Sequence, residues 1–210
     1  YRVYLIGNAI PGTNSLAIVS QWQFVSLVVE VFQESTVLAI FFFLGSQLRS
    51  PAAVQLDRMK SDLACISVGA FIFAALVFSF RDAFIAVIGT SGEIEEETRA
   101  FLGVSIFSTP FTLLSAAVIV LLESLRKRGL VLVLAVANVA LLFVFDSLFF
   151  GGYSFSLNLG VIGTAWSTVL SSLLLFVTGA ALLCMTMGIS LASLARRPSF
   201  RDMRQFFRVG

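Results

Sequence analysis

The sequence predicts an all-α protein that crosses a membrane several times, and three observations lead to this prediction. Of its 210 residues, 58% are hydrophobic and only 12% are charged, whereas about a quarter of the residues of a soluble domain are charged. The mean hydropathy is +0.97. The apolar residues gather in runs of about twenty or more, the length that an α-helix needs to cross a bilayer. We therefore expect a polytopic membrane protein.

Five complete spans and the end of an earlier helix are expected, in chain order. Residues 1–10 (YRVYLIGNAI) indicate the end of a first helix, which the sequence PGTN stops. The complete spans follow at about 16–48, 63–88, 100–122, 130–150 and 159–187. Pro110 is expected to kink the third span and is a candidate hinge. Without an initiator methionine or a signal-peptide pattern, we expect the chain to belong to a longer protein.

The basic residues between the spans predict the orientation. Eleven of the fourteen Lys and Arg residues occur in the segments 49–60, 126–128 and 196–208. The alternate segments contain only three, beside the acidic run GEIEEE. By the positive-inside rule, the three basic segments are expected to be cytoplasmic. Two of them include the amphipathic stretches SPAAVQLDRMKSDL and SFRDMRQFFRVG, which either connect the spans or rest on anionic membrane lipid.

Two carboxylates occur inside the first complete span. Glu30 lies about fourteen residues, or roughly 21 Å, into this helix, and Glu34 is one turn further on the same face. An ionised acid at the bilayer centre costs at least about 2.5–3.5 kcal/mol. A proton or cation site would explain both residues. The alternatives are an interhelical hydrogen bond to a serine or asparagine, or a shifted helix that brings one glutamate to the interface.

A second polar group is expected between the fourth and fifth spans. Asp146 lies in the outer part of the fourth span, with Asn138 two turns further inward on nearly the same face. Thr164 and Thr168 lie one turn apart in the outer half of the fifth span. Together these residues would form an oxygen-rich cluster suited to a proton or a hard monovalent cation. For the threonines alone, helix packing is the favoured interpretation.

No enzyme activity, cofactor or metal site is expected. The sequence contains no histidine, which excludes imidazole metal sites and Ser–His or Cys–His nucleophile pairs. Its two cysteines, Cys65 and Cys184, lack metal-ligand spacing and are expected to be small buried residues. No nucleic-acid partner is expected either.

The order of several short motifs resembles that of the multidrug and toxic compound extrusion (MATE) transporters. The matching pieces are YLIGNAI, FLGSQL, IAVIGTSGEIEEETRAFL, ESLRKRG, ANVALLFVFDSLFFGG, LGVIGTAWSTVLS and FRDMRQFFRVG, and they extend over nearly the whole chain. The resemblance implies that residues 1–195 are a MATE-like N-terminal lobe of six helices, without most of the first. Residues 196–210 would be a cytoplasmic connector toward a second six-helix lobe, in the same chain or in a partner subunit.

The resemblance also implies a function and a site. The family exports organic cations and amphipathic compounds against an inward flow of H⁺ or Na⁺, by alternating access of two lobes. Asp146 matches a cation-site acid of the family, and Thr164 or Thr168 matches its hydroxyl partner. Position 142, often Asn in the family, is Leu here, and the acid expected in the first helix falls at Arg2.

Arg2 changes what is expected of this site. It could pair with Asp146 or with a Glu of the next helix, which would neutralise the acid and weaken the case for Na⁺. Coupling could then have moved to Glu30 and Glu34. Two alternatives remain open: a flippase for a lipid-linked precursor, with Arg2 as its intramembrane arginine, and a membrane subunit that keeps the lobe as a scaffold without transport.

Overall fold

The computed structural model describes residues 2–9, 15–45, 52–88 and 93–189. Within these ranges the chain is helical apart from short turns, and no strand is present there. The helices are α1 (Arg2–Ala9), α2 (Ser15–Gly45), α3 (Ala52–Ser79), α4 (Arg81–Ile88), α5 (Glu93–Ser105), α6 (Ser108–Ser124), α7 (Arg128–Phe150) and α8 (Gly160–Met187). The all-α prediction is confirmed for the described part of the chain.

Five segments of the described chain are long and apolar enough to cross a membrane, as the sequence predicted. These candidate spans are Leu16–Ile40, Met59–Ser79, Ile94–Ser124, Arg128–Phe150 and Gly160–Met187. Their length and composition are those of a multi-pass membrane protein. Residues 2–9, where the sequence predicted a helix end, form the short helix α1.

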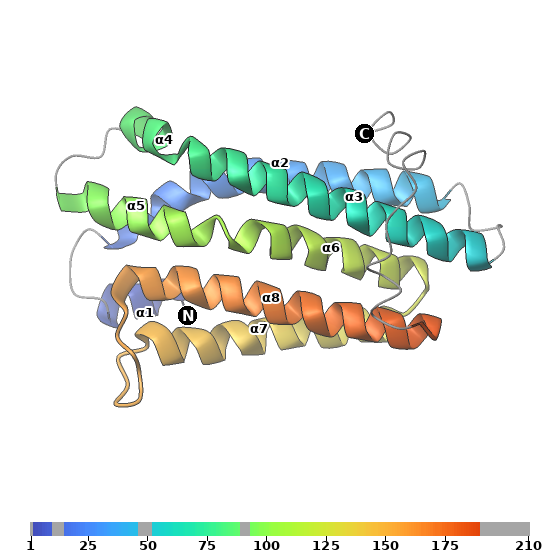
Figure 1. Cartoon of the computed structure of the whole chain (residues 1–210). Helices are drawn as coiled ribbons and strands as arrows, with labels where there is room; N and C mark the ends of the chain where they lie inside the picture. Colours follow the sequence, from blue (N-terminus) through green and yellow to red (C-terminus); the bar gives the residue numbers. More distant parts are fainter. Residues whose placement is uncertain (1, 10–14, 46–51, 89–92, 190–210) are drawn as a thin grey trace.

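The helices run side by side in three layers (Figure 1). Helices α2 and α3 form one layer, α5 and α6 the next, and α7 and α8 the last. Helix α6 lies in the middle and contacts α2, α3, α7 and α8. Helix α1 contacts α2 and α7.

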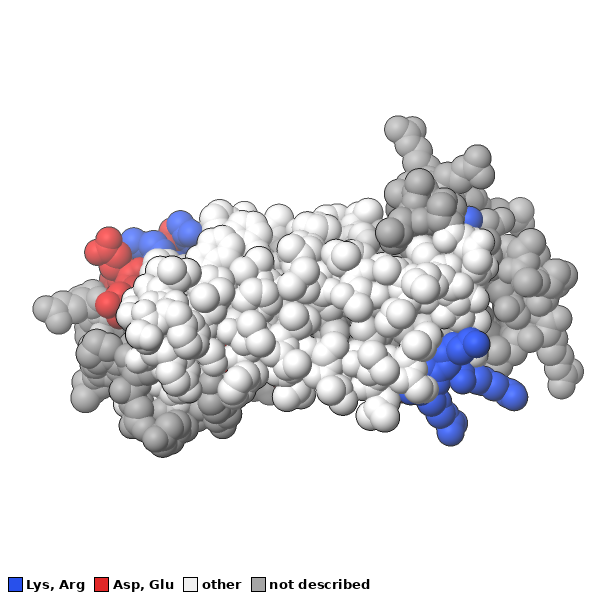
Figure 2. All heavy atoms as spheres, turned by 90° about the horizontal axis from the view of Figure 1, so that it is seen from below, with Lys and Arg blue, Asp and Glu red and all other residues white. Residues whose placement is uncertain are grey.

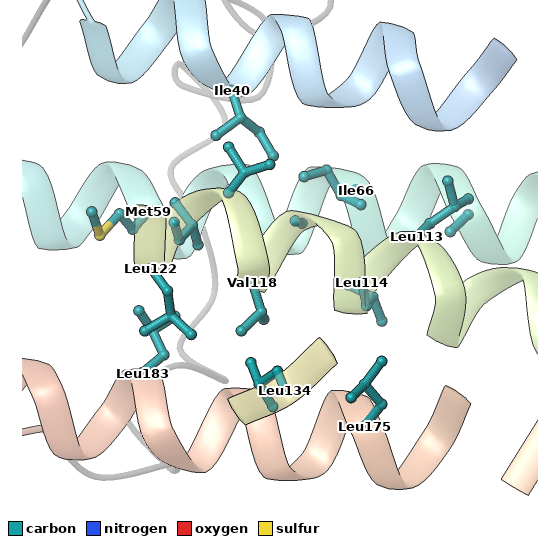
Figure 3. Packing of buried hydrophobic residues seen from close by; sticks show 14 residues of the cluster. Ile40, Met59, Ile66, Leu113, Leu114, Val118, Leu122, Leu134, Leu175 and Leu183 are labelled. Atoms are coloured by element: carbon teal, nitrogen blue, oxygen red, sulfur yellow. The ribbon is translucent and has the colours of Figure 1, made fainter. Parts of the chain in front are cut away.

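The main apolar core surrounds α6. Figure 3 shows side chains of α6 that extend toward Ile40 and Ile66 on one side and toward Leu134 and Leu183 on the other. By contrast, only four residues of α7 are fully buried, and one side of the helix, with Val136, Val139 and Phe143, is exposed. In a membrane, an apolar helix can expose such a surface because lipid tails are as apolar as leucine. Helix α7 is therefore an edge helix of the bundle.

The third predicted span is interrupted near Pro110, as expected. Helix α5 ends at Ser105 and α6 begins at Ser108. Pro110 has no N–H to donate to the Ile106 carbonyl, which accepts from the backbone N–H of Thr109 at 3.1 Å instead. The Ser108 hydroxyl donates to the Ser105 carbonyl at 2.6 Å. A role for Pro110 as a hinge stays a prediction.

The second span differs from the prediction at both of its ends. The span expected at 63–88 divides into α3 and α4 at Phe80, where the Arg81 guanidinium lies 4.6 Å from the Phe78 ring centroid. The amphipathic stretch from residue 52 onward continues directly into α3, because no glycine or proline separates it from the span. The expected connector at 196–210 lies outside the described residues.

Charged side chains gather at the two ends of the bundle (Figure 2). Arg126, Lys127 and Arg128 lie at the turn between α6 and α7, which we name the basic end. Glu95, Glu96 and Glu97 lie at the start of α5, which we name the acidic end. On the face that Figure 2 shows, the surface between the two ends carries no described charged residue.

Candidate functional site

Asp146 connects three helices at the acidic end. It lies one turn before the end of α7 and is 2% exposed. The Nη2 atom of Arg2 in α1 donates to Asp146 Oδ1 at 3.0 Å and to the backbone carbonyl of Thr164 in α8 at 2.8 Å. The Ser167 hydroxyl donates to the same Oδ1 at 2.5 Å. The ion pair of Arg2 with Asp146, one of the two pairings expected from the sequence, is therefore present.

The turn between α7 and α8 brings these groups together. The backbone N–H of Leu159 donates to the Phe149 carbonyl at 2.8 Å, which ties the start of α8 to the end of α7. At Gly163, an added Cβ would lie 3.1 Å from that same carbonyl oxygen. A glycine here lets the two helices approach closely, so that Ser167, one turn later, lies beside Asp146.

The ion pair decides what the Asp146 carboxylate can do. A buried carboxylate without a partner is strongly unfavourable, and more so among apolar helices. The Asp146 side chain is 3% exposed, whereas the Arg2 side chain is 34% exposed. The ionised carboxylate is therefore stabilised by the arginine. The guanidinium also occupies the place beside the carboxylate that a bound Na⁺ would take.

The two predicted threonines use their hydroxyls within α8. The Thr164 hydroxyl donates to the Val161 carbonyl at 2.8 Å, and the Thr168 hydroxyl donates to the Thr164 carbonyl at 2.9 Å. Thr164 joins the cluster through its backbone oxygen only. The hydroxyl that reaches Asp146 belongs to Ser167. In the sequence, Ser167 lies between the two threonines in GTAWST and carries the same kind of hydroxyl group. The pattern alone therefore did not single it out.

Asn138 lies apart from the Asp146 cluster. Eight residues of α7 separate it from Asp146, about 12 Å along the helix axis. Asn138 is half-buried, on the side of Asp146 toward the basic end. The structure therefore gives the cluster no amide ligand from this position.

One further hydroxyl near the cluster lacks a partner. Ser171 is 1% exposed, and its Oγ makes no hydrogen bond to any described residue. Because α7 and α8 are antiparallel and Asp146 lies beside Ser167, Leu142, one turn earlier, is level with Ser171, one turn later. The Leu142 side chain can neither donate nor accept a hydrogen bond, so this position of α7 offers the Ser171 hydroxyl no partner.

Glu30 and Glu34 lie on a different surface, the exposed side of α2. Neither carboxylate makes a hydrogen bond or an ion pair within the described part of the chain. Both belong to the candidate span Leu16–Ile40. An exposed ionised acid at this depth costs about 2.5–3.5 kcal/mol if it faces lipid. These two residues are therefore charges in the middle of a candidate span for which the described part of the chain supplies no partner.

The described ranges offer no cluster of protein ligands for a metal ion. No group of three or more His, Cys, Asp or Glu side chains is suitably placed in them. Cys65 in α3 and Cys184 in α8 are both buried, and neither forms a disulfide bond within the described residues.

Comparisons with known proteins give no relative: no family model, curated protein or solved structure matches the chain. The residues and their geometry are therefore the basis for the function proposed below.

Proposed function

We propose that this chain is one lobe of an ion-coupled antiporter that exports organic cations or amphipathic compounds by alternating access, with its basic end in the cytoplasm. The coupling ion is H⁺ or Na⁺, and Glu30 and Glu34 are the coupling groups. The observation that carries the proposal is the pair of carboxylates, one turn apart and without a described partner, on the exposed side of a membrane-spanning helix.

The Asp146 cluster supports this choice of coupling groups. Asp146 already has a fixed cation in Arg2, so loading an ion there would first require the arginine to leave. Glu30 and Glu34 face no such competitor in the described chain. In this proposal the Arg2–Asp146 pair joins α1 to α7 and α8, and ion binding takes place on α2.

Coupling follows from mutual exclusion between the ion and a cationic substrate. Protonation or cation loading neutralises the two carboxylates and weakens their attraction for the substrate. Loss of the ion restores that attraction. Linkage requires each ligand to weaken the binding of the other by the same factor, typically 5- to 150-fold.

The Arg2–Asp146 pair favours a second candidate, a membrane subunit that keeps the lobe as a scaffold without transport. An aspartate that is always paired with an arginine has no need to bind an ion, as expected in a lobe that has a structural role only. The lipid-precursor flippase has less support, because the arginine that would bind pyrophosphate is engaged with Asp146 and Thr164.

The test is ion-driven substrate efflux by the native full-length protein reconstituted in liposomes. We expect the double variant Glu30→Gln, Glu34→Gln to reduce the response of efflux to an ion gradient by about tenfold or more, within the usual range of coupling factors. Glu97→Gln is the matched control, because it removes an exposed carboxylate at the acidic end, outside the apolar part of the helix. Unchanged ion dependence in the double variant would refute the coupling role.

A further inference from the structure

Three buried polar atoms toward the acidic end have no hydrogen-bond partner in the described part of the chain. They are Nε of Arg2 in α1, Oε1 of Gln21 in α2 and Oγ1 of Thr98 in α5. The Thr98 residue is completely buried, with an exposed fraction of 0%. A buried polar atom without a partner is unfavourable, and the great majority of such atoms in folded proteins are bonded to protein or to water. Three of them in one region therefore require an explanation.

The three side chains border one apolar cluster, to which five helices contribute. Its members are Leu5, Ile6, Ile18, Phe101, Phe150, Val161 and Ala165. Each polar residue lies three positions from a member of the cluster on its own helix, so the two share one side of that helix. The three pairs are Arg2 with Leu5, Gln21 with Ile18, and Thr98 with Phe101. The unpaired atoms of α1, α2 and α5 therefore belong to the same packed region.

Gln21 and Thr98 lie at the same level of the bundle. Helices α2 and α5 are in contact and run in the same direction from the acidic end (Figure 1). Val25 and Leu102 belong to one apolar cluster, and Gln21 and Thr98 each lie one turn before them. The Gln21 oxygen is an acceptor and the Thr98 hydroxyl is a donor, yet no hydrogen bond joins them. A partner for both atoms therefore has to lie between the two helices.

The Thr98 hydroxyl is also not used within its own helix. The hydroxyls of Thr112, Thr168 and Thr186 each donate to the carbonyl four residues earlier, at 3.0, 2.9 and 2.8 Å. The Thr98 hydroxyl makes no such bond to the described chain. It keeps both its hydrogen and its lone pairs for a partner outside α5.

From these unpaired atoms we propose a buried water site between α1, α2 and α5, lined by Arg2, Gln21 and Thr98. Water both donates and accepts, so it can donate to the Gln21 oxygen, accept from Arg2 Nε–H and bond to the Thr98 hydroxyl. A buried water in a folded protein typically makes about three such bonds. The Arg2 side chain is 34% exposed, so water can enter beside it.

The site would give the guanidinium that neutralises Asp146 a second polar contact, with water from the acidic side. A bound cation is disfavoured there, because the guanidinium carries a positive charge. The inference goes beyond the proposed function and does not depend on Glu30 or Glu34. Each of the two can fail without the other.

X-ray footprinting of the native full-length protein in lipid nanodiscs tests the site. X-rays convert bound water to hydroxyl radicals, which oxidise adjacent side chains, and mass spectrometry locates the oxidised residues. We expect Phe101 to be oxidised although it is only 3% exposed, and several-fold more slowly in the variant Thr98→Val. Met59 is the internal reference, because it is 2% exposed in the apolar core around α6 and its sulfur oxidises readily. Its rate should not change. An unoxidised Phe101 in the native protein, or an equal rate in the variant, would overturn the proposal.

Thermal unfolding of the same variant is an independent test, because the sign of the shift differs between the two cases. With water bound, Thr98→Val removes a hydrogen bond that is satisfied, and the melting temperature should fall by a few degrees. Without water, the substitution removes an unpaired buried hydroxyl, and the melting temperature should rise. The matched control is Thr186→Val, whose hydroxyl donates to the Leu182 carbonyl of its own helix and which should shift the melting temperature less. A higher melting temperature for Thr98→Val would disprove the water site.

Discussion

The loss of Arg2 and the loss of Asp146 should have unequal effects on stability, because the two side chains are buried to different degrees. The aspartate is buried among α1, α7 and α8, while about a third of the arginine side chain is exposed. Removal of the arginine would leave a buried carboxylate that retains only the Ser167 hydroxyl. Removal of the aspartate would leave an arginine that can still reach solvent and the Thr164 carbonyl.

This asymmetry predicts the order of stability among variants at the pair. Arg2→Gln should lower the free energy of unfolding by about 1–3 kcal/mol, less than the roughly 3–5 kcal/mol for a fully buried pair. Asp146→Asn should cost less, and the double variant should lose less than the sum of the two single losses. Thermal unfolding of the full-length protein in detergent measures all three. Strictly additive losses would show that the two side chains do not interact.

The pairing was accessible from the sequence, but its details were not. A carboxylate and a guanidinium in apolar helices have to find partners, which made Arg2 with Asp146 one of two expected pairs. Thr164, Ser167 and Thr168 lie within about 100° of one another around the helix axis, so spacing alone does not decide which hydroxyl reaches Asp146. The pairing also required α1, which is distant in sequence, to lie beside α7.

At the scale of elements, close contact between α6 and α8 fixes the centre of the bundle. Gly179 of α8 lies against α6, where an added Cβ would be 3.0 Å from Val118 Cγ1 and 3.5 Å from Leu134 Cδ1 of α7. The Thr112 and Ser172 hydroxyls lie 3.1 Å apart across the same interface. Small residues at such positions let membrane helices approach.

Gly179→Val should therefore force α6 and α8 apart. We expect a loss of about 1–3 kcal/mol in unfolding free energy, the usual effect of overpacking a tight core. Gly129→Ala is the matched control, since nothing lies within 4 Å of an added Cβ there, and it should be neutral or slightly stabilising. The two variants are compared by thermal unfolding. Equal stability would mean that the α6–α8 contact tolerates extra volume.

The helix boundaries could be predicted where the end of an apolar run coincides with glycine or charged residues that end a helix. The spans expected at 130–150 and 159–187 are present as α7 and α8 because charged or glycine-rich turns bound them on each side. The second span was harder to delimit, because the amphipathic stretch before it has good helix formers and no breaker. Its end at Ser79 lies beside Arg81, whose guanidinium is 4.6 Å from the Phe78 ring centroid, and hydropathy does not capture such a local contact.

Over the whole molecule, the charge distribution and the polarity of the exposed faces carry separate information. The long axis runs from the acidic end to the basic end, which bears on orientation across the membrane (Figures 1 and 2). Around that axis, the exposed side of α2, which carries Glu30 and Glu34, differs from the apolar exposed side of α7. The charge difference between the ends arises mainly from residues at the turns and helix ends, whereas the difference in polarity arises from the sides of α2 and α7. Each property therefore needs its own experiment.

Orientation is tested by labelling at both ends of the same molecule. Glu96→Cys and Lys127→Cys place exposed thiols at the acidic and basic ends, in a background where the buried Cys65 and Cys184 are replaced by alanine. With a membrane-impermeant maleimide on right-side-out vesicles, Glu96→Cys should react at once and Lys127→Cys only after permeabilisation, because basic loops stay in the cytoplasm. The opposite pattern would invert the proposed direction of export. Labelling of both positions in sealed vesicles would mean that the bundle does not separate its ends across the membrane, which would remove the basis for alternating access.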